Sequence, residues 1–262
     1  MAVAVEPFRK LLLAELRAAA EPRRAPEMQR YLRTTMPILG VTTPNRNAAY
    51  RSVFPRVVFR DARDWRALCL GLFRGATFRE EWWAAVALTG DRRADEWQSM
   101  ETLPMYEEMI VTGAWWDVVD DIATHRLPTL LRRHPKPMRR VMLAWSRDEN
   151  LWKRRSAILC QIPFKKETDL RLLYACLEPS LASKEFFLRK AIGWALRQYA
   201  WTDPDEAARY VEENRGRLSG LSIREALKNV PKGKGTPVRR SRGSARAAPP
   251  SHRRSARRSV SP

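Results

Sequence analysis

The sequence is poor in the residues that build disulfides and metal sites. It has three cysteines and three histidines in 262 residues. Cys69, Cys160 and Cys176 are odd in number and form no CxxC pair, so we expect reduced, buried thiols in a cytoplasm-like compartment. His125 and His134 have no cysteine at ligand spacing, which argues against a zinc site. We therefore predict a protein that uses no metal and no other cofactor.

Long apolar runs are absent as well. No stretch approaches the roughly 20 apolar residues that a membrane-spanning helix needs. The opening segment, MAVAVEPFRKLLLAEL, has too short an apolar run for a secretory signal, and acidic residues interrupt it. These absences predict a soluble, cytoplasmic protein with no membrane partner.

Signals for β-strands are also missing, because no alternating β-branched run is followed by hairpin turn residues. Apolar residues instead recur at spacings of three and four, as in DWRALCLGLFRG and EFFLRKAIGWALRQYA. Helix-start residues precede three such segments: Thr42 and Thr43 before Pro44, Ser183 before Phe186, and Asp203 before Pro204. The links between segments are short, so neighbouring helices should be antiparallel. We predict an all-α fold.

The positive charge is unevenly distributed. Residues 231–262, PKGKGTPVRRSRGSARAAPPSHRRSARRSVSP, contain ten Lys or Arg and no acid. The whole chain carries +20, so residues 1–230 carry the other +10. The stretch has almost no large apolar residue, which predicts a disordered basic tail after a folded domain of residues 1–230. Such an arm most often binds a polyanion, usually nucleic acid, and a merely solubilising extension is the alternative.

A weak internal repeat runs through the folded part. Steps of 35 residues lead from Asp120 to Arg155 and on to Lys190. The surrounding segments WWDVVDDIA, LWKRRSAIL and FFLRKAIGW are similar, and EEWWAAVAL is a further unit upstream. A period of about 35 to 40 residues with two helices per unit is typical of an α-solenoid. In that fold the three side chains should lie on the same side of successive helices.

The same segments resemble a known family. WWDVVD, LWKRRSAILCQIPFK, SKEFFLRKAIGWALRQYAWTDP, LSIREALK and MQRYLRTTMPILGVTTPNRNA are similar to the AlkD-type DNA alkylation repair enzymes, the HEAT-like-repeat alkylpurine DNA glycosylases. The similarity covers about residues 5–230 and leaves out the basic tail. It implies an α-solenoid of HEAT-like helical hairpin repeats whose concave face binds duplex DNA.

The resemblance also implies an activity. Such enzymes are monofunctional glycosylases of base excision repair, which hydrolyse the N-glycosidic bond of cationic purines alkylated at N3 or N7, such as 3-methyladenine and 7-methylguanine. The family uses no metal and no lyase lysine, and its chemistry does not require the base to be flipped into a pocket, unlike that of most glycosylases. We expect the chain to act as a monomer on double-stranded DNA.

Particular residues carry the resemblance. The family's catalytic residues correspond to Trp116, Asp120, Arg155 and Trp194. Contacts to the DNA backbone are expected from Tyr31, Thr43, Arg46, Arg154 and Lys190. The chain departs from the family in TPNRN, where Asn47 stands in place of a second arginine, so one phosphate contact lacks its expected residue.

The residue types suit the chemistry. Breaking a glycosidic bond builds positive charge on the sugar, and an alkylated purine is already cationic, so a carboxylate is needed more than an acid. Asp120 would stabilise that charge and position water. The rings of Trp116 and Trp194 offer cation–π contacts of about 1–2 kcal/mol. Arg155 is expected to hold a phosphate in a bidentate fork.

Each signal also has a simpler interpretation. Tryptophans at these spacings are commonly core residues, and a lone aspartate is commonly solvated or paired with an arginine. We interpret Trp115, Asp117 and Asp121 as structural: the tryptophan packs inward, and the two acids pair with neighbouring bases.

The alternative function is a non-catalytic HEAT-like scaffold for distorted or branched DNA. A helical adaptor for protein partners is disfavoured, because the expected groove positions are basic and not apolar.

Overall fold

The computed structural model describes residues 5–231, and within that range all the regular secondary structure is helical, with no strand. The α-helices are α1 (Val5–Ala18), α2 (Ala25–Leu32), α3 (Thr43–Val53), α4 (Ala62–Arg74), α5 (Arg79–Leu88), α6 (Leu103–Gly113), α7 (Trp116–Asp121), α8 (Leu127–Arg133), α9 (Pro135–Trp145), α10 (Leu151–Leu159), α11 (Leu170–Leu177), α12 (Phe186–Tyr199), α13 (Pro204–Glu213) and α14 (Gly220–Ala226). The predicted all-α fold is confirmed. The predicted basic tail lies outside the described residues, apart from Pro231.

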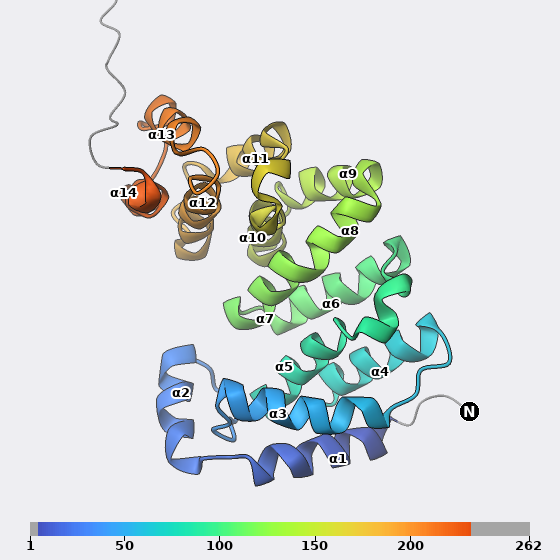
Figure 1. Cartoon of the computed structure of the whole chain (residues 1–262). Helices are drawn as coiled ribbons and strands as arrows, with labels where there is room; N and C mark the ends of the chain where they lie inside the picture. Colours follow the sequence, from blue (N-terminus) through green and yellow to red (C-terminus); the bar gives the residue numbers. More distant parts are fainter. Residues whose placement is uncertain (1–4, 232–262) are drawn as a thin grey trace, which may run out of the picture.

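The helices stack in chain order along a curved path (Figure 1), which is the predicted α-solenoid. Helices close together in the chain pack on one another, either as direct neighbours or as next-but-one neighbours, and the most extensive pairings are between α12 and α14, α10 and α12, and α4 and α5. Helix α2 lies apart from the stack, and it faces α14 across the open side of the curve (Figure 1). Each unit covers the apolar face of the next, so the core extends along the stack and has no single centre.

The buried apolar side chains form two clusters that meet at α10. Trp152 and Ala157 belong to the cluster that begins at Phe8. Ile158 and Leu159 of the same helix belong to the cluster that ends at Ala226. Helix α10 therefore contributes to both clusters, and Arg155 on it is buried.

Two of the three predicted helix starts are at the predicted residues. Thr42 is the N-cap residue of α3, and Asp203 caps α13 by accepting a 2.9 Å hydrogen bond from the Glu206 amide. The third prediction was wrong by two residues: α12 begins at Phe186, and its N-cap residue is Glu185. Ser183 instead accepts a 3.2 Å hydrogen bond from the Glu185 amide, within the turn that precedes the helix.

A π turn interrupts one long helix in the middle of the stack. The segment η5 (Ile122–Arg126) joins α7 to α8 without a break in the helical path. In a π turn each hydrogen bond spans five residues, so the turn changes which residues share a face beyond it. Such single turns occur frequently at functional sites. This one follows directly after Asp120 and Asp121.

Candidate active site

The concave side of the stack contains a cleft of about 620 Å³. Its walls come from six elements far apart in the sequence: α2, α3, α5, α7, η5 and α12. The polar and aromatic residues that line it are Tyr31, Thr43, Arg46, Asn47, Tyr50, Trp83, Trp116, Asp117, Asp120, Asp121, Thr124, His125 and Trp194. Three carboxylates and five large aromatic rings therefore meet in one concavity of a protein whose net charge is +20.

A tight turn aims the two adjacent tryptophans in different directions. Helix α6 ends at Gly113, and Ala114 adopts a left-handed conformation with φ 36°. Trp115 is extended, with φ −152° and ψ 151°, and acts as the N-cap residue of α7. Its ring packs inward against Trp152 and Phe187, with centroid distances of 5.9 and 5.1 Å, as expected from the sequence. The reversal leaves Trp116 on the cleft side.

The carboxylate of Asp120 is held by Arg155. The guanidinium donates two hydrogen bonds of 2.7 Å, from Nε to Oδ1 and from Nη2 to Oδ2. Nη1 donates a third bond, of 2.6 Å, to the Phe187 carbonyl. The Arg155 side chain is only 5% exposed and that of Asp120 is 17% exposed. The guanidinium is therefore occupied within the protein and does not present the free fork that the phosphate role requires.

Burial sets the acidity of this carboxyl. It raises the pKa of Asp120 above its usual value, because the charged form loses contact with water. The hydrogen bonds and the positive charge of Arg155 oppose that rise, and the negative charge of Asp117 adds to it. The pair thus holds a poorly solvated anion in a fixed orientation at the cleft wall.

Aromatic residues line the same cleft as this anion. The Trp116 and Trp194 rings line the cleft together with Asp120, although Trp194 comes from α12, far along the chain. The Tyr31 ring, which is 73% exposed, meets the Trp116 ring edge to face at a centroid distance of 5.7 Å. Of the predicted site residues, Tyr31, Trp116, Asp120 and Trp194 therefore line the same cleft.

Asp117 has a structural partner, as the sequence suggested. Arg79 of α5 donates a 2.9 Å hydrogen bond to its carboxylate, and Trp83 Nε1 donates another of 2.7 Å. The Asp117 and Arg79 side chains are only 7% and 4% exposed. Asp121 lies 3.4 Å from the His125 ring and 3.9 Å from the Arg126 guanidinium. Both acids thus fix α7 and its surroundings.

The predicted backbone contacts fall into two groups. Thr43 and Arg46 line the cleft, and the Arg46 guanidinium stacks over the Trp83 ring at 4.5 Å. Arg154 and Lys190 are not among the lining residues. Arg154 donates to Ser180 Oγ at 3.0 Å, and Lys190 pairs with Glu225 at 2.9 Å. The structure therefore brings only the first group to the catalytic candidates.

The 35-residue period extends one unit beyond the predicted repeat. A further step from Lys190 reaches Glu225, a residue of α14 that is 5% exposed. The first and third of these steps join ion-paired residues, because Asp120 bonds Arg155 and Lys190 bonds Glu225. Glu225 also bonds Arg197 at 2.7 Å and Lys228 at 2.6 Å, and hydrogen bonds from Lys228 and Lys190 are the largest influences that lower its pKa to about 2.

Sequence reasoning missed Trp83 as a cleft residue. A signal was available, since EEWWAAVAL contains a tryptophan pair like the pair in AWWDVVD. It missed Glu225 and His125 for a different reason. Neither stands in a distinctive pattern, and each becomes notable only through contacts that the fold creates.

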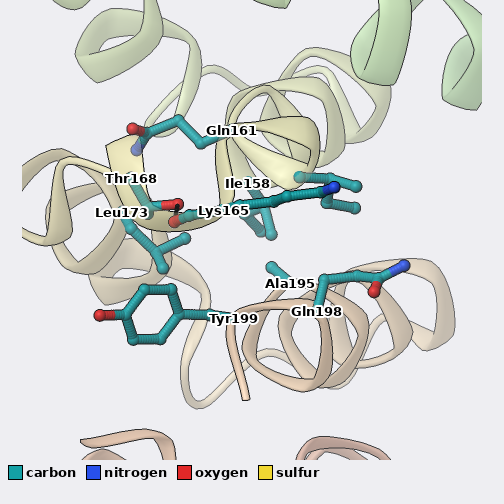
Figure 2. A pocket seen from close by; sticks show the side chains of 9 residues that line it. Ile158, Gln161, Lys165, Thr168, Leu173, Ala195, Gln198 and Tyr199 are labelled. Atoms are coloured by element: carbon teal, nitrogen blue, oxygen red, sulfur yellow. Dashed lines mark hydrogen bonds between the residues drawn. The ribbon is translucent and has the colours of Figure 1, made fainter. Parts of the chain in front are cut away.

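A second cavity lies between α10 and α12 (Figure 2). The side chains of Ile158 and Leu173 face those of Ala195 and Tyr199 across it. Its volume, about 10 Å³, is barely enough for one water molecule, so it is too small for a nucleotide. Within residues 5–231 there is no group of three potential metal-ligating side chains, and no helix is long and apolar enough to cross a membrane.

Comparisons with known proteins agree with this arrangement. A family model described as DNA alkylation repair enzyme matches residues 12–230. A solved structure described as a predicted DNA alkylation repair enzyme from Enterococcus faecalis is 26% identical, with a TM-score of 0.69, and the match covers 81% of this chain and 97% of that one. No curated protein matches the sequence. The chain belongs to the DNA alkylation repair enzyme family, whose role in the repair of alkylated DNA makes DNA its partner.

Proposed function

We propose that the protein is a monofunctional DNA glycosylase of the AlkD type, built of HEAT-like repeats. It hydrolyses the N-glycosidic bond of cationic N3- and N7-alkylated purines in duplex DNA. The observation that carries this proposal is the Asp120 carboxylate, fixed by Arg155 in a cleft that Trp116 and Trp194 also line. A fixed anion between aromatic faces suits a substrate whose positive charge moves from the base to the sugar.

Asp120 supplies the electrostatic part of the mechanism. As the bond to the cationic purine lengthens, the sugar acquires oxocarbenium character and positive charge. A poorly solvated carboxylate stabilises that charge more strongly than one in bulk water. Each carboxylate oxygen accepts two hydrogen bonds, and Arg155 uses one on each, so Asp120 keeps the capacity to orient an attacking water.

The other residues have supporting roles. Trp116 and Trp194 contact the cationic nucleotide through their faces and edges. Arg155 acts through Asp120 as a positioning residue: it fixes the carboxylate rotamer and limits loss of its charge. Tyr31, Thr43 and Arg46 contact the DNA near the lesion, and Arg154 and Lys190 contact the backbone farther along the stack.

The decisive experiment measures the release of free base from a duplex that contains one N7-methylguanine, under single-turnover conditions, with an undamaged duplex as the control. We expect release only from the damaged duplex, and no covalent adduct trapped by borohydride, because no lysine forms a Schiff base with the sugar. Binding to DNA without release from any N3- or N7-alkylpurine would instead identify a non-catalytic scaffold for distorted DNA.

A further inference from the structure

We infer that His125 is a phosphate ligand that engages DNA only when its ring is protonated. The inference rests on the proposed function, because the anion it names is a phosphate of the duplex that enters the cleft. It adds to that function a dependence of DNA affinity on pH, which the Asp120 chemistry does not supply.

The position of His125 is suited to such a contact. The residue lies in the π turn η5 (Ile122–Arg126) and lines the same cleft as Asp120 and Trp116. Its side chain is 64% exposed, so one edge of the ring is open to a ligand. The extra residue in the π turn shifts the register of the helix next to Asp120 and Asp121, so a local feature of the backbone presents this ring to the cleft.

The ring is anchored through one nitrogen. Nδ1 lies 3.0 Å from the Asp121 carbonyl oxygen and 3.2 Å from Thr124 Oγ. A proton on Nδ1 satisfies the carbonyl, which leaves Nε2 to face outward. Among residues 5–231 no hydrogen bond to Nε2 is present. The neutral ring then offers a lone pair, which a phosphate oxygen repels, whereas the protonated ring offers an N–H donor with a positive charge.

Asp121 favours the protonated form. Its carboxylate, 3.4 Å from Nδ1, raises the pKa of His125 above the usual value through hydrogen bonding and charge, while burial and Arg126 oppose the rise. Arg46 of α3 acts on the same carboxylate from across the cleft.

Most other charged groups on the elements packed around η5 are paired with residues other than His125. The pairs are Glu107 of α6 with Lys153 of α10, Glu108 of α6 with Arg74, Arg155 of α10 with Asp120, Arg132 of α8 with Glu167 of η6 (Ile162–Glu167), and Arg133 of α8 with Asp95. Arg154 of α10 bonds Ser180, and η6 also carries Lys165 and Lys166. Asp121 is therefore the partner that sets the protonation of His125.

The sign of the pH dependence follows. The phosphate contact is fully present below the pKa of His125 and is lost as the pH rises through it. A bound phosphate favours the imidazolium further, so the midpoint of the loss should lie above the usual pKa of a histidine.

The test measures equilibrium binding of the full chain to an undamaged duplex at constant ionic strength, from about pH 6 to about pH 8.5. We expect the wild-type affinity to fall about tenfold over this range, the size of one charge-assisted hydrogen bond. His125→Gln should bind at every pH as weakly as the wild type does at high pH. His125→Lys, a permanent cation, should bind tightly with little pH dependence.

Two further variants separate this role from a merely structural one. Asp121→Asn should move the midpoint of the pH dependence to lower pH, because the partner that raises the His125 pKa has lost its charge. His134→Gln, which changes a histidine at the junction of α8 and α9, should follow the wild type. A His125→Gln curve that coincides with the wild-type curve would overturn the inference and leave the glycosylase proposal intact. Failure of the wild type to bind duplex at any pH would overturn both.

Discussion

The Asp120 carboxylate and the Arg155 guanidinium form two hydrogen bonds of 2.7 Å, although 35 residues separate them in the sequence. A third bond, from Arg155 Nη1 to the Phe187 carbonyl, ties the pair to the first turn of α12. Three successive units of the stack thus meet at one anion. The arginine is committed to the carboxylate in the DNA-free protein, whereas the sequence suggested a phosphate grip.

Asp120→Asn should abolish most base release while DNA binding is retained. The amide has nearly the same shape but no charge, so the stabilisation of the oxocarbenium-like sugar is lost. Loss of one such interaction lowers rates on the order of 10²–10³-fold. Single-turnover rates and duplex affinity, measured on the same substrate, check this prediction. Asp95→Asn, which alters an exposed acid paired with Arg133, is the matched control and should retain the wild-type rate.

Arg155→Ala should lower both the rate and the stability. Removal of one partner of a buried ion pair typically costs about 3–5 kcal/mol, because the other charge is left uncompensated. Arg155→Lys should recover part of the rate, since it restores the charge but not the two-point fork. Denaturant unfolding and single-turnover rates measure the two effects.

The salt dependence of DNA binding distinguishes the two roles of Arg155. If the guanidinium is committed to Asp120 in the complex as well, the salt slope of Arg155→Ala should equal that of the wild type. A slope lower by about one unit would show instead that Arg155 holds a phosphate, as the sequence suggested.

Local patterns were sufficient to predict the helices. The spacing of apolar residues in segments such as DWRALCLGLFRG reflects one buried helix face, and α4 indeed buries Trp65, Leu68 and Leu72. The Ser183 prediction failed because a serine hydroxyl can bond a nearby amide in a turn as well as at a helix cap. Such local choices depend on the path of the chain before the helix, which the pattern does not contain.

The site was predictable only in part. Because Trp116 and Asp120 are four residues apart, the sequence predicts that they share one face of a helix. The partner of Asp120 does not, because a bidentate pair depends on the separation and rotation of α7 and α10. The same holds for the bond from Trp83 to Asp117 and for the cluster around Glu225. These contacts arise from the superhelical stacking of units, a global property that no short window of sequence encodes.

The rate of base release should fall as the solution is acidified. The reaction needs ionised Asp120, and burial raises the pKa of this carboxyl above its usual value of about 4. The rate is therefore full above that pKa and declines as the pH falls through it. Saturating enzyme removes any contribution from DNA affinity, including that of His125. Measured against pH, the residual rate of Asp120→Asn should show no such decline, and a decline shared by both proteins would assign the titration to another group.

The close contact between α12 and α14 allows a test of whether α14 positions Trp194, with a substitution outside the proposed catalytic residues. Gly193 immediately precedes Trp194 and lies against α14. A Cβ at this position would stand 2.5 Å from the Glu225 Cβ and 2.9 Å from the Ser222 carbonyl oxygen. The second neighbour is backbone, so α14 must move if a side chain is added. That movement would disturb the Lys190–Glu225 ion pair and the position of the Trp194 side chain.

Gly193→Ala should therefore destabilise the protein by about 1–3 kcal/mol, the usual effect of overpacking, and lower the rate of base release. Gly216→Ala is the matched control, because a Cβ there meets nothing within 4 Å. It should leave both stability and rate close to those of the wild type. Denaturant unfolding gives the stability, and the single-turnover rate at a temperature where both variants remain folded isolates the effect on Trp194. If Gly193→Ala unfolds with the wild-type midpoint and turns over at the wild-type rate, α14 does not position this side of the site.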